Sequence, residues 1–430
     1  MSAIFDTTEE YALMLDRRDS LGGFRERFYI PEGKIYMDGN SLGLLSKDAE
    51  QSLLKALDDF KKLAIDGWMD GNPPWFTFAE ELGRKHSFLV GAGENEVIVH
   101  SSNTVNLHNL IATFFRPYGT KNKILIDELN FPSDRYAVDS QLRLHGLDPK
   151  THAVVVTSRD GRTLEEEDIV KAMTGDIALA ILPSVLYRSG QLLDLEYLTK
   201  EAHKRGIPIG FDCCHSVGAV PHKFSEWGVD FAFWCSYKYL NSGPGATAGI
   251  YVNSRHFGKA PGLWGWWGCD KSKQFDMSPE FFKARGAGAW QIGTVHLFST
   301  APLLGSLKIF SEAGIENIRE KSLKQTEYLM FLIDKLLTAE PYNFKIGTPR
   351  QPQRRGSHIA LEHDTEAVRI NTALKKRGVI PDFRFPNVIR LAPIALYTSY
   401  HEIWQVVRHI EEIIDLKEYE SFPKERGTVS

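Results

Sequence analysis

The stretch FAFWCSYKYLNSGPGATAGIYV, residues 231–252, contains a single charged residue, Lys238. An apolar run precedes this lysine, a tyrosine lies on each side of it, and small Gly-rich residues follow. Lysine is usually solvated, because burying an unpaired ammonium costs free energy. The common case is therefore a surface lysine whose stem covers apolar neighbours. This setting also allows a second interpretation, a buried amine that serves as the nucleophile of Schiff-base chemistry.

The composition is that of an ordinary globular protein. The 430 residues carry 51 Lys and Arg against 55 Asp and Glu, a net charge of -4, with 43% hydrophobic residues. No basic block, no apolar run of about 20 residues and no signal-peptide pattern occurs. The four cysteines form no C-x-x-C pair, which predicts reduced thiols and a cytoplasmic location. The 14 histidines show no metal-ligand spacing, so we expect a small-molecule enzyme without a metal.

Apolar strands alternate with helical segments between about residues 95 and 255. The alternation predicts an α/β fold with a mostly parallel sheet and helices on both faces. The predicted strands are EVIVHS, NKILID, HAVVVT, IALAILPSV, IPIGFD, VDFAFWC and TAGIYV.

The pattern changes near residue 305. A long helical stretch begins there, and SHIALEH, NVIRLAP and two further helices follow, which predicts a smaller α+β domain. We therefore expect an N-terminal segment 1–45 that packs with the small domain, a large domain 46–304 and a small C-terminal domain 305–430.

Polar side chains follow the predicted strands, at the end where open α/β sheets bind ligands. Asp212 ends IPIGFD, 26 residues before Lys238, and Asn103 and Thr104 open the helix after EVIVHS. Helix capping is the simpler explanation of each feature taken alone. Together, a lysine amine, an acid for a pyridinium nitrogen and a helix start for a phosphate predict a pyridoxal 5'-phosphate (PLP) enzyme.

Seven motifs, in chain order, resemble the kynureninase family. They are DGNSLGL (38–44), TVNLH (104–108), FPSDRYAVDSQLRLHG (131–146), FDCCHSVG (211–218), WGVDFAFWCSYKYLNSGPG (227–245), GWWG (265–268) and IRLAPIALYTS (389–399). The match runs from about residue 36 to 410. The resemblance implies the PLP-dependent transferase fold type I, with a seven-stranded sheet in the large domain.

The resemblance also implies residue roles. Lys238 would carry the cofactor covalently, Asp212 would pair with the pyridinium nitrogen, and Tyr237 would be an acid–base group. Phe131 would stack on the cofactor ring. The other expected cofactor contacts are Asn103, Thr104, Pro132, Ser133, Asp134, Ser184, His215, Trp266 and Thr294, the last from the other subunit of a homodimer with active sites at the subunit interface.

The implied reaction is hydrolysis of L-kynurenine to anthranilate and L-alanine, in tryptophan degradation and the kynurenine pathway toward NAD biosynthesis. Arg390 would bind the substrate α-carboxylate as a forked pair. Ser41, Trp68 and Thr294 would also contact the substrate. Tryptophan and threonine at the last two positions are typical of bacterial members, so we expect kynurenine to be preferred over 3-hydroxykynurenine.

The alternative is another fold type I enzyme, such as a cysteine desulfurase, a selenocysteine lyase or an aminotransferase. The first two use a cysteine in a mobile loop near the C-terminal domain, whereas every cysteine here lies at or before Cys269. A non-catalytic ligand-sensing module is a further alternative. About 35 residues precede the first matched motif, which is too few for the helical DNA-binding domain expected of such a regulator. A purely structural protein is disfavoured by the joint presence of Lys238, Asp212 and Arg390.

Overall fold

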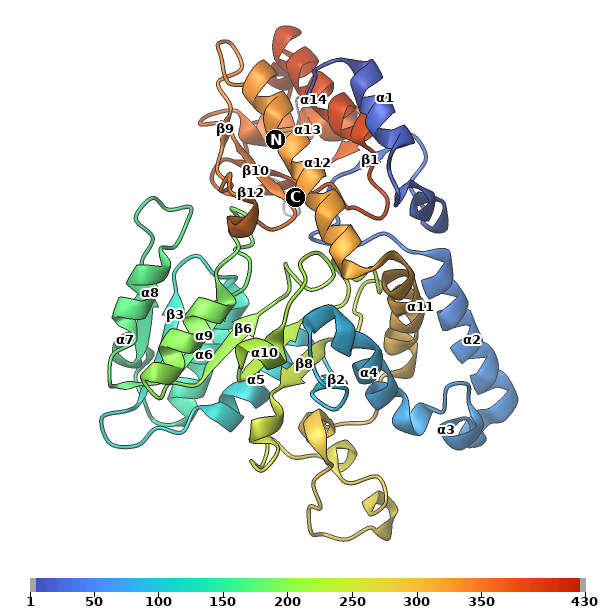
Figure 1. The fold of residues 1–430 in the computed structure, drawn as a ribbon, viewed down its shortest axis with the longest axis vertical. Helices are drawn as coiled ribbons and strands as arrows, with labels where there is room; N and C mark the ends of the chain where they lie inside the picture. The colour runs from blue at the N-terminus through green and yellow to red at the C-terminus, as the bar shows by residue number, and fades with distance from the viewer. Residues whose placement is uncertain (1–4, 426–430) are drawn as a thin grey trace.

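The computed structural model describes residues 5–425, and the elements form two groups with separate hydrophobic cores. Figure 1 shows the second group, in orange and red, at one end of the molecule together with the blue helix α1 (Glu9–Arg17). The first group holds the large sheet. Among the described residues no helix is both long and apolar enough to cross a membrane.

The first group is built on a seven-stranded sheet of order β2-β8-β7-β6-β5-β3-β4. Its strands are β2 (Val97–Val99), β3 (Lys123–Asp127), β4 (Ala153–Val156), β5 (Ile177–Pro183), β6 (Ile209–Asp212), β7 (Phe231–Trp234) and β8 (Gly249–Val252). Only β8 runs antiparallel to its neighbours. Every residue of β5, β6 and β7 is buried, as expected of strands covered on both faces. All seven predicted strands and the α/β fold are confirmed.

The first group also contains ten helices among the described residues. They are α2 (Lys47–Leu63), α3 (Gly67–Asp70), α4 (Phe78–Val90), α5 (Asn103–Phe114), α6 (Pro132–Leu144), α7 (Pro149–His152), α8 (Glu166–Ala172), α9 (Leu195–Lys204), α10 (Phe224–Trp227) and α11 (Leu297–Ala313). Helix α2 begins at a true N-cap, since the Ser46 hydroxyl accepts from the Ala49 amide at 3.1 Å. Its buried side packs along α11.

The second group is an antiparallel sheet of order β12-β13-β10-β9 packed with three helices. The strands are β9 (Lys345–Ile346), β10 (Ile359–Glu362), β12 (Asp382–Arg384) and β13 (Val388–Leu391), and the helices are α12 (Ile315–Leu336), α13 (Ala367–Lys376) and α14 (Tyr400–Asp415). The N-terminal segment joins this group. Strand β1 (Ile35–Tyr36) pairs in parallel with β11 (Val379–Ile380), and α1 packs on α14.

The long helical stretch predicted from about residue 305 is two helices, α11 and α12. Gly314, with φ of +77°, separates α11 from α12, because a glycine adopts this backbone conformation at little cost. The boundary expected at 304/305 lies inside α11, which packs in the first core. Along α12 the packing changes from the first core at Ile318 to the second at Leu329.

Candidate active site

The carboxyl ends of β2, β3, β5, β6 and β7 meet at one edge of the large sheet, because these strands are parallel. The edge faces the second group: the carbonyl of Tyr187, just after β5, accepts a hydrogen bond from Arg390 of β13 at 2.7 Å. The polar residues that follow these strands therefore lie beneath the small sheet. This arrangement is the one expected for a ligand site in an open α/β fold.

Lys238 lies four residues after the end of β7, half-buried at this edge. Its amine is 3.0 Å from Nε2 of His215 and 5.8 Å from the centre of the Phe131 ring. Burial, reinforced by the charge of Lys238, holds the pKa of His215 well below its usual range. His215 is therefore neutral and accepts a hydrogen bond from the lysine.

Asp212 ends β6 and is 7% exposed. Its Oδ1 accepts from the Cys214 amide at 2.8 Å, and its carbonyl accepts from the Ser184 hydroxyl at 2.9 Å. Ser184 is fully buried and supports the strand end.

Asp134, on α6, faces Asp212. Burial, with the neighbouring Asp212 carboxylate as the next cause, raises the pKa of Asp134 well above its usual value. The Asn130 amide donates to Asp134 at 3.0 Å. Two adjacent carboxyl groups in a buried place favour a cation, so the pair suits a protonated ring nitrogen.

Two helix starts meet beside this pair. Helix α5 begins at Asn103 and α6 at Pro132, and the hydroxyls of Thr104 and Ser133 are 2.9 Å apart. The N-cap side chain of α5, Ser102, makes no capping hydrogen bond to a described residue. Free amides at helix starts bind phosphate.

These residues fit PLP. The lysine amine, the pair of carboxyl groups and the helix starts are the three parts that such a cofactor requires. Two buried polar atoms of the site, His215 Nδ1 and Asn103 Oδ1, also lack a hydrogen-bond partner within residues 5–425. Buried polar atoms without partners are uncommon and suggest a place for a ligand.

Comparisons with known proteins decide the family. A family model described as the kynureninase C-terminal domain matches residues 318–410. The curated kynureninase of Geobacillus thermodenitrificans is 59% identical over 429 residues and covers 100% of both chains. That of Bacillus mycoides is 58% identical over 426 residues, 99% of each chain.

The chain belongs to the kynureninase family.

Solved structures agree on the fold. A C-DES variant with glycine covalently linked to its PLP cofactor has a TM-score of 0.78 at 16% identity, covering 90% of this chain and 99% of its own. A cysteine desulfurase from Thermococcus onnurineus has a TM-score of 0.77 at 16% identity, covering 91% and 98%. At this identity the likeness shows a shared fold type I architecture.

Of the expected substrate residues, Arg390 and Ser41 lie at this edge, whereas Trp68 lies in an aromatic group with Trp267, which also packs against Trp266. Arg390 is 1% exposed, and its Nη2 donates to the Ser41 hydroxyl at 2.8 Å. Trp68, on α3, packs against the rings of Trp75 and Trp267 at 5.7 and 5.4 Å. A Cβ on Gly67 would lie 2.1 Å from Trp75, so a glycine allows this packing.

Tyr237 adjoins Lys238, with its ring centre 5.9 Å from the lysine amine. Burial, followed by the neighbouring Cys235, raises the pKa of Tyr237 far above its usual value. The Tyr237 carbonyl accepts from the Gly43 amide at 2.8 Å, which ties the N-terminal segment to the lysine loop.

Trp266 and Thr294 are not brought to this cluster within one chain. Both are exposed, Trp266 at 44%. They lie on adjacent segments, because a Cβ on Gly265 would be 1.9 Å from the Ile292 carbonyl. In Figure 1 the yellow segment that contains them projects from the large group at the end away from the small one.

Two residues near the site were missed by sequence reasoning. Tyr187 packs edge-on against Phe131, with ring centres 5.4 Å apart. It lies in the VLYRSG segment after β5, and a position just after a strand could have indicated that it is near the site. His358 is fully buried, with its ring 6.0 Å from that of His215. Its place in the chain, before β10, gave no local signal.

Proposed function

We propose that this chain hydrolyses L-kynurenine to anthranilate and L-alanine with PLP as its cofactor. The observation that carries the proposal is the Lys238 amine, which lies against neutral His215 at the same sheet edge as Asp212. The names printed for the curated relatives agree with this reaction. Buried Arg390, facing that edge, is the cation suited to an α-carboxylate.

When bound, PLP supplies an electron sink that stabilises negative charge on the substrate carbon beside the amine. The other tasks fall to residues of the chain. Asp212 balances the positive charge of the ring nitrogen. Lys238 holds the cofactor and, once its amine is free, accepts the α-proton. His215, being neutral, orients that amine without repelling its charge.

Tyr237 is suited to donate a proton to the side-chain carbonyl of the substrate. Its raised pKa means that the hydroxyl keeps its proton at neutral pH. A proton donor is what a carbonyl needs as water adds to it. Burial is the largest cause of this raised pKa.

The substrate preference that we propose is for kynurenine over 3-hydroxykynurenine. It is supported by Trp68, whose indole packs among aromatic rings, and by Thr294, which would come from a partner subunit. A site without a dedicated partner for the ring hydroxyl discriminates little in its favour. The double variant Trp68→His, Thr294→Asn should shift the ratio of kcat/KM values toward 3-hydroxykynurenine; an unchanged ratio would refute both roles.

The experiment that tests the reaction follows anthranilate and alanine from L-kynurenine, beside L-3-hydroxykynurenine, with PLP added. Lys238→Ala should abolish product formation, and Lys61→Ala, at an exposed position, should leave it unchanged. Cleavage of neither substrate by the PLP-loaded protein would overturn the proposal. Release of sulfide from cysteine would instead support the desulfurase alternative.

We further propose a homodimer whose active sites are completed across the subunit interface. Exposed Trp266 and Thr294 support it, because a cofactor contact has no role on a bare surface. Large apolar side chains are exposed on nearby and neighbouring segments: Trp264, Trp266, Phe275, Met277, Phe282 and Phe298. Exposed apolar patches of this kind mark interaction sites.

Hybrid dimers test this assembly. When Lys238→Ala and Trp266→Ala chains are mixed and allowed to exchange, each hybrid dimer contains one site with both native residues. The mixture should regain about a quarter of the wild-type rate, since half the dimers are hybrids. A rate no higher than the sum of the two variants would place Trp266 in its own chain's site.

The division into an N-terminal segment, a large domain and a small domain is likewise a proposal, with the second boundary moved into α12. It is supported by the two cores that meet along this helix. We place the activity in tryptophan degradation in the cytoplasm. The four free cysteines are typical of a reducing compartment.

A further inference from the structure

Arg390 is almost fully engaged by the protein itself. Its Nε and Nη2 both donate to Asp382, its Nη2 also donates to the Ser41 hydroxyl at 2.8 Å, and its Nη1 donates to the Tyr187 carbonyl at 2.7 Å. A guanidinium has five N–H groups in a fixed plane. The edge formed by Nε and Nη2 is therefore occupied, and the Nη1–Nη2 end is the one that a ligand can share.

Asp382 is placed opposite Arg390 by the register of the small sheet, in which β12 and β13 pair these two residues directly. Asp382 is 0% exposed. Its Oδ2 also accepts from Nε of Arg384 at 2.9 Å, while its Oδ1 has no partner among the described residues. The carboxylate is held between two guanidinium groups and cannot turn away.

The charge of Arg390 depends on this carboxylate. Burial lowers the pKa of Arg390, and Asp382 is the largest influence that raises it. A buried cation without a counter-ion would be strongly unfavourable, and the long side chain would have other rotamers to adopt. Asp382 thus supplies both a charge partner and a fixed orientation.

We propose that Asp382 is a positioning residue that sets the Arg390 guanidinium for the substrate α-carboxylate. This inference rests on the proposed function of Arg390. Asp382 holds the Nε–Nη2 edge, so the Nη1–Nη2 end points to the sheet edge that carries Lys238. The Ser41 hydroxyl occupies the place on Nη2 where a carboxylate oxygen would bind, and it yields that place to the substrate.

The test compares two ligands in the PLP-loaded enzyme. L-kynurenine carries the α-carboxylate, and kynuramine, its analogue without that group, serves as an inhibitor. Asp382→Asn should raise KM for L-kynurenine about 10- to 100-fold, as expected when a charge-assisted hydrogen bond is lost. The value of kcat should change by less than about threefold, and kynuramine inhibition should not change. Asp364→Asn, at an exposed ion pair of the same domain, is the matched control.

A purely structural role for Asp382 predicts a different result. It would weaken both ligands equally, which would overturn the inference; a lower midpoint of thermal unfolding is expected in either case, because Arg390 loses its counter-ion. If Asp382→Asn fails to fold, Asp382→Glu keeps the charge but displaces it by one methylene. That variant should still raise KM for L-kynurenine and leave kynuramine inhibition unchanged; an unchanged KM would refute positioning by Asp382.

The Arg390→Gln variant separates this inference from the proposed function. If Arg390→Gln leaves KM for L-kynurenine unchanged, the carboxylate role of Arg390 is wrong. If Arg390→Gln raises KM and Asp382→Asn does not, only the inference about Asp382 is wrong. If the carboxylate role of Arg390 and the positioning role of Asp382 are both correct, the two substitutions combined should raise KM no further than Arg390→Gln alone. The reason is that Asp382 acts through the arginine.

Discussion

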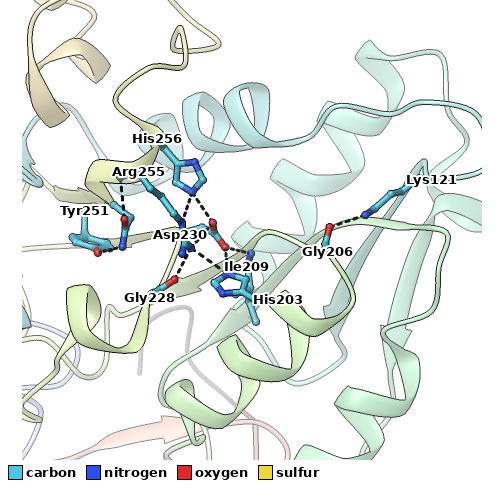
Figure 2. Close-up of polar contacts among 10 residues, drawn as sticks. Lys121, His203, Gly206, Ile209, Gly228, Asp230, Tyr251, Arg255 and His256 are labelled. Carbon is cyan, nitrogen blue, oxygen red and sulfur yellow. Dashed lines mark hydrogen bonds and ion pairs between the residues drawn. The ribbon is translucent and has the colours of Figure 1, made fainter.

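Two buried aspartates lie at opposite ends of neighbouring parallel strands. Asp212 ends β6 at the edge that faces the small group, and Asp230 directly precedes β7 at the other edge. Figure 2 shows Asp230 surrounded by donors: His203 at 2.9 Å, His256 at 2.6 Å and Arg255 at 2.7 Å. Asp212 faces another carboxyl group, Asp134, instead.

The two ends of the strands differ in whether residues of the chain supply positive charge to the buried carboxyl groups. Burial alone would raise the pKa of Asp230, but hydrogen bonds from His203 and His256 lower it below its usual value. At the other end, burial and Asp212 raise the pKa of Asp134. Residues of the chain itself donate hydrogen bonds to Asp230. The chain leaves the Asp212–Asp134 pair without a full complement of positive charge, which is the arrangement expected where a cationic group of a ligand completes the site.

The largest effect is expected from removing the charge at the cofactor end. Asp212→Asn should lower kcat about 10²- to 10³-fold, the range for loss of one preorganised electrostatic partner. Stability should not fall, because the substitution also removes repulsion with Asp134. Single-turnover rates check the predicted loss of kcat, and thermal unfolding of the same preparation checks the predicted stability. A large loss of stability with normal kcat would reverse the assignment of the two ends.

The opposite result is expected at the other edge. Asp230→Ala removes the acceptor for two histidines, Arg255 and the Ile209 amide, so the free energy of unfolding should fall by about 3 kcal/mol. The activity of the folded fraction should be unchanged. Urea unfolding measures the free energy of unfolding, and kcat per folded molecule measures the activity of the folded fraction. A stable but inactive variant would show that this edge takes part in catalysis.

Acid should destabilise the protein through four buried histidines. Burial lowers the pKa of His86 and His100 to about 4 and that of His222 and His358 to about 3. The unfolded chain therefore binds more protons below pH 6.5, and stability falls as pH falls. At pH 5 each of these four histidines should lower the free energy of unfolding by roughly 2 kcal/mol.

The urea midpoint at pH 7 and pH 5 measures this loss, and His222→Gln should reduce it. Glutamine can still reach the Ser216 hydroxyl, which lies 2.9 Å from Nε2 of His222, but it does not titrate. An equal pH dependence in the variant would mean that protonation of His222 does not contribute.

The smallest effect is expected from Asp134→Asn. Asparagine keeps the hydrogen bond from Asn130 and can donate to Asp212, so the unfolding free energy at pH 7 should rise by about 1 kcal/mol. The raised pKa of Asp134 means that the wild-type protein loses stability as pH rises through that pKa, and the variant should not. The pH dependence of unfolding by urea checks this; a loss of stability at pH 7 would show that the Asp134 charge is needed for folding.

Local patterns were sufficient for the architecture and for the centre of the site. The seven strands are short apolar runs between turn residues, and such runs form buried strands wherever a parallel sheet is built. Asp212 ends β6 and Lys238 follows β7 by four residues, so parallel pairing of these strands brings both residues to one edge. The family resemblance added roles that spacing could not supply.

Long-range contacts decided the rest. Asp382 meets Arg390 only because β12 and β13 adopt one register, and a shift of one residue would turn the two side chains to opposite faces. Asp230 gathers His203 and His256 from segments that are distant in the chain. The sequence by itself determined which strands form and what stands at their ends, because these depend on neighbouring residues. Only the tertiary structure decided how each buried charge is paired, because pairing depends on segments that meet after folding.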